Sequence, residues 1–150
     1  MSAPIHGTAV EIDGCAVLFV GPSGSGKSDL ALRLIDRGAR LIGDDAVTLH
    51  SRDGALFVKA SDAIENRIEV RGVGIFDMDA TAQCPLRLLV ELGADGERLP
   101  ASWPLRDLNG WSLPVLRLDA FAASAPIKIE LAVKSLVDEG LYPMRLPVAS

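Results

Sequence analysis

The sequence has few cysteines, no long apolar run and no excess of positive charge. Cys15 and Cys84 are its two cysteines and form no C-x-x-C pair, so we expect reduced core thiols rather than a disulfide or a zinc site. The longest apolar stretch, CAVLFV at 15–20, is far too short to span a bilayer. A net charge of −5 disfavours nucleic acid as a partner, because its phosphates require a basic face.

The first residues also lack the basic segment and apolar run of a targeting signal. We therefore expect a cytoplasmic protein with no membrane association. The chain has 150 residues and shows neither an internal repeat nor a low-complexity tract. A single domain over residues 1–150 is the expectation.

A glycine-rich stretch at 21–28, GPSGSGKS, fits the P-loop pattern G-x-x-x-x-G-K-[ST]. Its glycines allow consecutive backbone N–H groups to turn inward around phosphate oxygens. Residues 16–20 predict a buried strand before it, and 28–38 predict an amphipathic helix after it. Lys27 would reach the β- and γ-phosphates, and the Ser28 hydroxyl would bind magnesium. The predicted nucleotide-binding residues are Gly21, Pro22, Ser23, Gly24, Ser25, Gly26, Lys27 and Ser28.

Two Asp-Gly dipeptides predict tight hairpins on either side of the P-loop helix. Asp13-Gly14 joins predicted strands at 8–12 and 16–20, and Asp53-Gly54 joins strands at 46–51 and 55–60. The P-loop strand therefore has a predicted antiparallel neighbour, which is unusual for a nucleotide-binding fold. We expect an α/β P-loop domain with a mixed, partly antiparallel sheet.

The second half of the chain predicts fewer elements. Residues 86–92 and 112–121 are predicted strands, and the Pro/Gly-punctuated stretch 93–111 is predicted to be a loop. A helix is expected from a Ser124 cap to Gly140, with Pro126 in its first turn. The tail at 141–150 is expected to pack on its own domain or on a neighbouring subunit.

Three acidic residues are candidates for the phosphate site. Asp44 and Asp45 follow the apolar strand 40–42 and can meet the P-loop magnesium as a Walker B residue does. A turn or cap is the alternative for this pair, and the P-loop favours the site. In EVRGVGIFDMD, 69–79, the glycines are expected to mark a bulge or close backbone approach. Glu69 and Arg71 would point to one side, where a carboxylate could bind the metal.

The sequence leaves more than one role open for each of three basic residues. His6 precedes the first hairpin, where it could lie near the phosphates or be an exposed histidine close to a terminus. Arg98 and Arg106 lie in the predicted loop, where either could clamp a phosphate or pair on the surface. The sequence does not choose between them.

Four segments together resemble the catalytic domain of the HPr kinase/phosphorylase family, which phosphorylates a serine of the phosphocarrier protein HPr. They are His6-Gly7, GPSGSGKSDLAL at 21–32, RGARLIGDD at 37–45 and EVRGVGIFD at 69–77. The similarity runs from His6 to Met78, with a weaker continuation to Val133. A P-loop alone would indicate only an NTPase, whereas this combination is specific.

The resemblance implies roles for individual residues and a set of partners. It makes Lys27 the phosphate-binding lysine and Ser28 and Glu69 magnesium ligands. It makes Asp45 the acid/base with Asp44 beside it, His6 an active-site partner and Arg98 the family's loop arginine. It also implies ATP and Mg²⁺ as cofactors, an HPr-like phosphocarrier of the phosphotransferase system as partner, and a homo-oligomer, a hexamer in the family.

Two departures from the family are expected to matter. The family's usual N-terminal domain has no counterpart in these residues, which corresponds to a short form consisting of the catalytic domain. LDAFAASAP, 118–126, stands where the family carries a basic PVxxGRN loop associated with dephosphorylation. Dephosphorylation by phosphorolysis is therefore in doubt.

Two other classes of function compete with a protein-serine kinase. A small-molecule kinase related to ATP-dependent carboxykinases would need an enclosed pocket and a lid, for which the chain offers little room. A nucleotide-binding switch without catalysis would be expected to lack a base beside the γ-phosphate. Asp44 and Asp45 argue against the switch.

Overall fold

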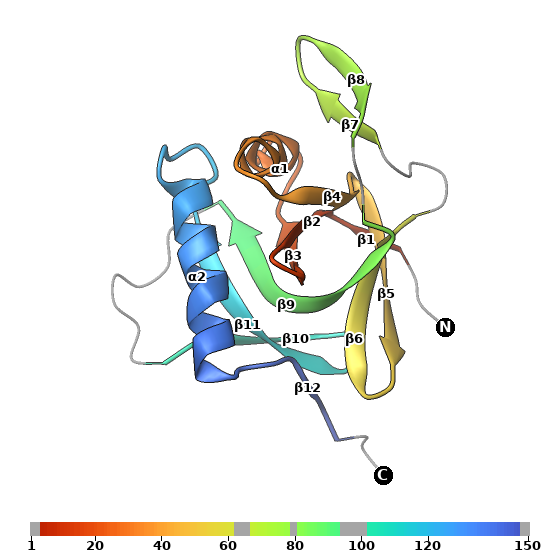
Figure 1. Ribbon diagram of the computed structural model, residues 1–150, viewed down its shortest axis with the longest axis vertical. Helices are drawn as coiled ribbons and strands as arrows, with labels where there is room; N and C mark the ends of the chain where they lie inside the picture. Colours follow the sequence, from red (N-terminus) through yellow and green to blue (C-terminus); the bar gives the residue numbers. More distant parts are fainter. Residues whose placement is uncertain (1–3, 62–66, 79–80, 94–101, 148–150) are drawn as a thin grey trace.

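The protein is α/β, as the sequence predicts, and its computed structural model describes residues 4–61, 67–78, 81–93 and 102–147 (Figure 1). The elements over these residues are β1 (Pro4–His6), β2 (Thr8–Ile12), β3 (Cys15–Val20), α1 (Lys27–Asp36), β4 (Arg40–Gly43), β5 (Ala46–Arg52), β6 (Ala55–Ala60), β7 (Arg67–Val70), β8 (Gly74–Asp77), β9 (Gln83–Leu92), β10 (Leu105–Leu108), β11 (Trp111–Leu118), α2 (Ala125–Glu139) and β12 (Met144–Arg145).

β9 is the strand around which the sheet is built. Its C-terminal part lies parallel to the P-loop strand β3 and to β11, while its first residues pair antiparallel with β6. Its strong curvature in Figure 1 lets one strand serve both halves of the sheet. Among the described residues the sheet has the order β1-β5-β6-β9-β3-β2-β4, with β10, β11 and β12 attached through β11. The expected mixed sheet is confirmed.

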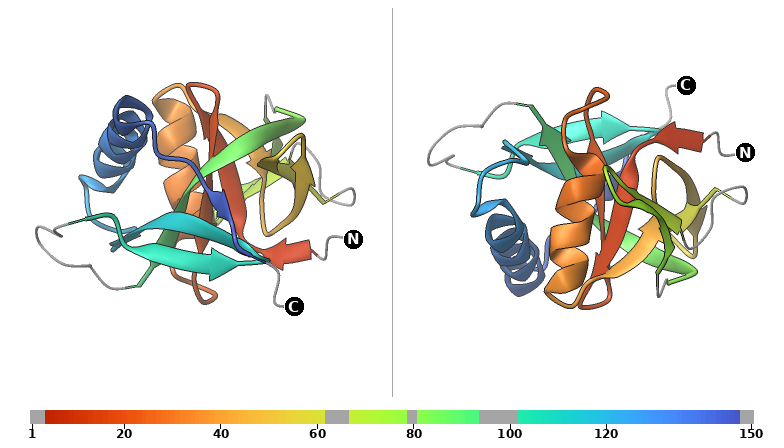
Figure 2. Two further views of the ribbon diagram at one scale, coloured as in Figure 1. Left: turned by 90° about the horizontal axis from the view of Figure 1, so that it is seen from below. Right: turned by 90° about the horizontal axis from the view of Figure 1, so that it is seen from above.

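Both faces of the P-loop strand are buried. Val17 and Phe19 of β3 join the cluster beneath α1 and α2, whereas Ala16 and Leu18 join a second cluster with β5, β6, β9 and β11. This is the alternation that a strand between two layers requires. The two helices lie side by side on one face, with α1 between α2 and the β7–β8 hairpin (Figure 2). Buried packing on both faces fixes the end of β3, from which the P-loop emerges.

The two predicted Asp-Gly hairpins are confirmed. Asp13 and Gly14 have φ values of 49° and 82°, and Asp53 and Gly54 have values of 52° and 79°. Two consecutive residues with positive φ give the turn a backbone twist that matches the twist of the two strands in a two-residue hairpin. They connect β2 to β3 and β5 to β6, antiparallel in each case.

Three predictions about the second half of the chain are wrong. The stretch 93–111 is not all loop, because β10 pairs antiparallel with β11 across an Asn109-Gly110 turn. The strand predicted at 112–121 ends at Leu118. The glycines at 72 and 74 mark neither a bulge nor a close backbone approach: 71–73 form a turn, and β7 and β8 fold back on each other as a separate hairpin.

The C-terminal helix and the tail agree better with what the sequence predicts. α2 has Ser124 at its N-cap position, although its side chain makes no capping bond, and Gly140 ends the helix with φ 68°. The tail packs on its own domain: β12 pairs with β11, and the Arg87 guanidinium lies 3.7 Å from the Tyr142 ring centre.

The expectations about thiols and membrane spans can also be compared with the fold. Both cysteines are free, Cys84 being buried and Cys15 partly buried. Burial raises the pKa of Cys84 to about 12. Within the described ranges no helix combines the length and the apolarity that crossing a membrane demands.

Candidate active site

The P-loop has the strand–loop–helix context that its sequence predicts. β3 ends at Val20 and α1 begins at Lys27, and Gly24 and Gly26 both have positive φ values, 84° and 94°. A Cβ added to Gly26 would lie 3.0 Å from the Ala120 Cβ and 3.1 Å from Phe121 Cζ. This position therefore requires glycine both for its backbone angle and for the close approach of the loop before α2.

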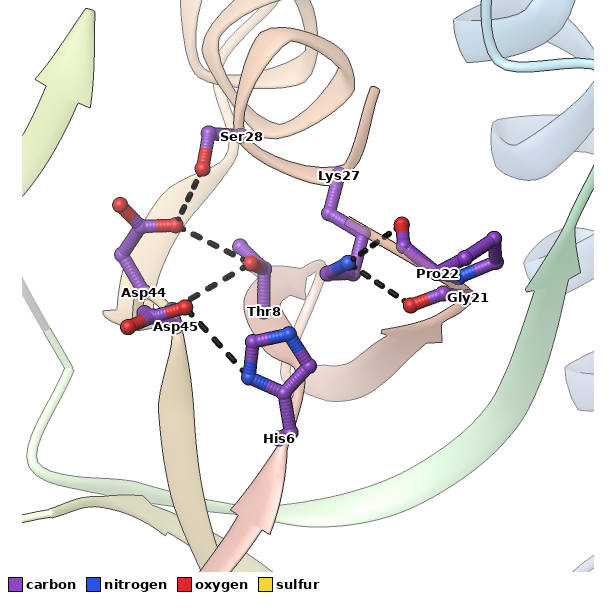
Figure 3. A network of polar contacts seen from close by, with 8 residues as sticks. All are labelled: His6, Thr8, Gly21, Pro22, Lys27, Ser28, Asp44 and Asp45. Atoms are coloured by element: carbon purple, nitrogen blue, oxygen red, sulfur yellow. Dashed lines mark hydrogen bonds and ion pairs between the residues drawn. The ribbon is translucent and has the colours of Figure 1, made fainter. Parts of the chain in front are cut away.

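The Lys27 ammonium is held inside the loop. It donates hydrogen bonds to the carbonyl oxygens of Gly21, at 2.8 Å, and Pro22, at 3.1 Å (Figure 3). Lys27 is only 8% exposed, so these two bonds offset much of the cost of burying its charge. They place a fixed positive charge at the N-terminus of α1, where anions are favoured.

Asp44 is the most connected carboxylate of the site. Its Oδ1 accepts hydrogen bonds from Ser28 Oγ at 2.6 Å and from Thr8 Oγ1 at 3.0 Å, and its Oδ2 accepts one from the Glu69 backbone N–H at 3.2 Å. The residue is 6% exposed. Because the Ser28 hydroxyl donates its hydrogen bond to Asp44, its lone pairs remain available for a cation.

Asp45 has a different environment from Asp44. Its side chain is 75% exposed, and Oδ1 lies 3.5 Å from His6 Nδ1 (Figure 3). β1 pairs with β5 so that His6 faces Ala46, and the Gly7 N–H donates to the Asp45 carbonyl, which explains this proximity. The φ of Asp45 is 70°, a left-handed conformation that aspartate tolerates better than most residues. Asp45 is thus free to contact a substrate.

Thr8 is a site residue that sequence reasoning missed. It is fully buried, donates to Asp44 Oδ1, and its Oγ1 accepts the Asp45 backbone N–H at 3.5 Å. The available signal was a hydroxyl at the first position of a mostly apolar strand, directly after His6-Gly7. Its hydroxyl connects the two aspartates.

Glu69 enters the site from the separate β7–β8 hairpin. The bond from its backbone N–H to Asp44 anchors β7 against the end of β4. Glu69 and Arg71 line the same cleft, as does Val70 between them, and Arg71 lies in the turn that follows β7. Arg71 was not predicted as a site residue, although its place two residues after Glu69 was the signal for it.

A cleft of about 350 Å³ joins these groups. It is lined by His6, Ser23, Gly24, Gly26, Lys27, Ser28, Asp29, Leu32, Asp45, Glu69, Val70, Arg71 and Phe121. The lining therefore includes five of the predicted P-loop residues, together with His6, Asp45 and Glu69. Gly21 and Pro22 contribute through their bonds to Lys27 rather than as lining.

Arg106, one of the two arginines considered as phosphate clamps, is not part of this lining. Arg98 lies outside the described residues. Arg106 donates two hydrogen bonds of 2.7 Å to Glu91, which also accepts one from Arg117. The Arg106 hydrogen bond, with Arg117 adding to it, lowers the pKa of the Glu91 carboxyl. In the described part of the chain, Arg106 thus makes the surface pair that was its alternative role.

The donor set fits a hard divalent cation. The Ser28 hydroxyl, oriented by Asp44, and the Glu69 carboxylate offer only oxygen, which Mg²⁺ prefers. The described residues hold no preformed group of three His, Cys, Asp or Glu side chains suited to a metal. Mg²⁺ usually uses one or two protein carboxylates and completes its shell with phosphate oxygens and water.

A family model matches the part of the chain that carries this site. The model "HPr Serine kinase C-terminal domain" matches residues 1–82, more than half of the 150-residue chain. The chain belongs to this family. The matched range contains the P-loop, both aspartates and Glu69.

Individual members of the family are similar to the chain over different lengths. An HPr kinase/phosphorylase from Mycoplasmopsis pulmonis is 32% identical over 147 residues, covering 89% of this chain and 45% of the relative. One from Clostridium botulinum (strain Eklund 17B) is 46% identical over 74 residues, covering 49% of this chain and 24% of the relative. The chain thus spans less than half the length of these relatives.

A solved structure extends the likeness to the whole fold. The Hpr(Ser) kinase/phosphatase from Coxiella burnetii matches with a TM-score of 0.78 and 25% identity, covering 92% of this chain and 98% of that one. The expected fold of the HPr kinase catalytic domain is therefore confirmed. The roles of individual side chains stay predictions.

Proposed function

We propose that residues 1–150 form a single P-loop catalytic unit that transfers phosphate from ATP to a serine of an HPr-type phosphocarrier of the phosphotransferase system. One observation carries the proposal: the P-loop groups Lys27 and Ser28 line the same cleft as the exposed carboxylate of Asp45. Phosphoryl transfer requires charge neutralisation on the phosphates and a base beside the attacking oxygen, and this cleft has groups for both.

Different residues bind the phosphates and the metal ion. Lys27 and the loop N–H groups bind the β- and γ-phosphates, and Ser28 and Glu69 hold Mg²⁺. When bound, Mg²⁺ supplies the charge that neutralises the phosphate oxygens. Asp44 keeps the Ser28 hydroxyl oriented through their 2.6 Å bond. Asp29, Asp45 and Glu69 also line the cleft, so a polyphosphate enters most favourably with a cation.

Asp45 acts as the base. Its carboxylate takes the proton of the substrate serine as the serine oxygen forms its bond to the γ-phosphorus, and the bond to the β-phosphate oxygen breaks to release ADP. An exposed carboxylate can approach a serine on another protein, whereas Asp44 is buried and accepts three hydrogen bonds. His6, 3.5 Å from Asp45, holds this carboxylate at the rim.

A folded protein is the favoured acceptor because large apolar side chains are exposed on the β7–β8 hairpin beside the cleft, and others on α2 and the tail. Val73 and Ile75 of the β7–β8 hairpin are each 70% exposed, close in sequence to the cleft residues Glu69 and Arg71. α2 and the tail expose Leu131, at 61%, and Met144, at 70%. A carrier docked on the β7–β8 hairpin would exclude water from the cleft.

A small-molecule kinase of the carboxykinase type remains the alternative. It would need an enclosed pocket, and Asp45 at 75% exposure lies at an open rim. A non-catalytic nucleotide switch has no need of an exposed carboxylate beside the phosphate site. The geometry favours the protein kinase over both.

The reverse reaction, phosphorolysis, is proposed to be slower than the kinase reaction. Inorganic phosphate would attack the phosphoserine, Asp45 would return its proton to the serine oxygen, and pyrophosphate would leave. Aligning two anions requires more positive charge than Lys27 and Arg71 supply, and residues 119–123 carry no basic side chain. Pyrophosphate release from phosphorylated carrier as fast as the forward transfer would contradict this.

We extend the proposal to assembly and location. A homo-oligomer, a hexamer by family resemblance, would bury the apolar side chains of α2 and the tail, and a cytoplasmic site would give access to the carrier. Sedimentation of the purified protein tests the assembly. A monomer that phosphorylates the carrier at the full rate would exclude a site shared between subunits.

The direct test is incubation with γ-labelled ATP and Mg²⁺, with and without an HPr-type carrier. The proposal predicts label on the carrier only when the P-loop protein is present. Replacing the acceptor serine of the carrier by alanine is the matched control and should abolish labelling. ATP binding without any carrier labelling would overturn the proposal.

A further inference from the structure

Phe121 is an exposed aromatic side chain at the mouth of the P-loop cleft. The side chain is 65% exposed, and contact of so much apolar surface with water is unfavourable. It lines the cleft and approaches Gly26 so closely that a Cβ there would lie 3.1 and 3.2 Å from its ring atoms. Its ring is thus held beside the phosphate loop while much of its surface faces solvent.

The backbone around Phe121 is fixed from two directions. The Arg33 guanidinium of α1 donates hydrogen bonds to the carbonyl oxygens of Ala120 and Ala122, on either side of Phe121. The Phe121 N–H donates to Asp119 Oδ1 at 2.9 Å. Arg33 is itself held by Asp29, 3.0 Å away and one turn earlier in the helix. The segment that carries the ring is therefore attached to the P-loop helix.

The orientation of the nucleotide follows from the proposed function, on which this inference rests. Transfer requires the γ-phosphate to lie toward Asp45, on the side where Asp44 joins Ser28 to the β7 hairpin. α1 lies between that hairpin and α2, and the Phe121 segment leads into α2 (Figures 1 and 2). A triphosphate lying along the loop must then direct its nucleoside away from β7, toward Phe121.

We infer that Phe121 is the platform on which the nucleobase of the bound nucleotide stacks. Its ring offers a π-face next to the phosphate loop, and stacking a base on an aromatic ring typically strengthens binding severalfold to a hundredfold. The clamp on its backbone lowers the ordering cost of binding, because the segment is already positioned. Phe121 contacts the base only and has no part in the transfer chemistry.

Calorimetric titration with Mg-ATP and with Mg-tripolyphosphate tests the inference, because the second ligand has the phosphates without the base. Phe121→Ala should raise the Kd of Mg-ATP about tenfold and leave that of Mg-tripolyphosphate unchanged. Phe121→Trp should retain tight ATP binding, whereas Phe121→Leu, apolar but without a ring, should not. Leu105→Ala, on β10 and likewise 65% exposed, is the control and should change neither.

The results separate this inference from the proposed function. Equal weakening of both ligands by Phe121→Ala, or weakening of neither, would overturn the base platform whether or not the carrier is phosphorylated. Selective loss of ATP binding in a protein that transfers nothing to the carrier would support the platform and overturn the kinase. Failure of the parent to bind either ligand would overturn both.

Discussion

Ser28 Oγ donates a 2.6 Å hydrogen bond to Asp44 Oδ1, joining the end of the P-loop to the end of β4. The same carboxylate accepts hydrogen bonds from Thr8 Oγ1 and from the Glu69 N–H. Three chain segments far apart in sequence therefore meet on one buried side chain. In the proposed function the two adjacent aspartates therefore have different roles, Asp44 positioning the hydroxyl on the metal side and Asp45 facing the substrate.

Asp44→Asn is expected to impair metal use more than nucleotide contact. An amide can keep only one of the two carboxylate oxygens, so its NH₂ group would face either the donors at Oδ1 or the Glu69 N–H. The magnesium concentration needed for half-maximal transfer should rise about tenfold or more. A magnesium titration of the transfer rate measures this. An unchanged half-saturation point would show that the Asp44 bond does not position Ser28.

Asp45→Asn is expected to stop transfer and leave ATP binding nearly intact. Asparagine also tolerates the positive φ of 70° at this position, so the backbone should be preserved. Loss of a general base typically costs about 100- to 10,000-fold in rate. Single-turnover rates and Mg-ATP affinity, measured on the same preparation, distinguish the two effects. If Asp45→Asn remains active and Asp44→Asn is dead, the two roles are reversed.

Lys27→Ala should weaken Mg-ATP binding about 10- to 100-fold, the usual range for a charge-assisted hydrogen bond to a buried partner. The variant also loses the bonds to the Gly21 and Pro22 carbonyls, so its thermal unfolding must be recorded beside the calorimetry. Arg106→Ala is a matched control, since that arginine pairs with Glu91 outside the cleft. Parent-like ATP affinity in Lys27→Ala would show that the phosphates bind elsewhere.

Glu69→Gln keeps the shape of the side chain and its backbone bond to Asp44 but removes the carboxylate charge. Transfer at limiting magnesium should fall and be partly restored by excess metal. Asp77→Asn, on the same hairpin and 86% exposed in its side chain, is the control and should behave as the parent. Equal activity of Glu69→Gln and parent at limiting magnesium would exclude Glu69 as a ligand.

Cys84 should be almost unreactive in the folded protein. Burial raises the pKa of its thiol to about 12, so at pH 8 only about one thiol in ten thousand is the reactive thiolate. In a Cys15→Ser background, a thiol reagent should modify Cys84 rapidly only after guanidinium denaturation. Fast reaction of the native variant would show that Cys84 is accessible, contrary to its 2% exposure at the pairing of β9 with β6.

The parts of the fold that sequence predicted are those encoded over short distances. Asp13-Gly14 and Asp53-Gly54 announce their turns because few other dipeptides adopt the required φ values. β10 shows the limit of this reasoning: its turn carries the same kind of signal, Asn109-Gly110, but the strand itself is mostly exposed and lacks an apolar pattern. Pattern and turn must agree before a hairpin is recognised.

The parts of the site that sequence could not predict depend on pairing between distant strands. Nothing local to Thr8 indicates that it will bond Asp44, because that contact requires β2 and β4 to be neighbours in the sheet. The proximity of His6 to Asp45 likewise needs β1 to pair with β5. Phe121 comes to the P-loop only because α2 packs beside α1. Sequence motifs therefore identified the phosphate-binding and acidic residues, whereas the residues that contact them could be found only from the pairing of distant strands.

The central claim is that the P-loop and Asp45 together phosphorylate a carrier protein. Its most direct measurement is the intact mass of an HPr-type carrier after incubation with Mg-ATP and either the parent or the Asp45→Asn protein. The carrier should gain the mass of one phosphate with the parent and none with the variant, although both bind Mg-ATP. An unmodified carrier with the parent, or equal modification by both proteins, would contradict it.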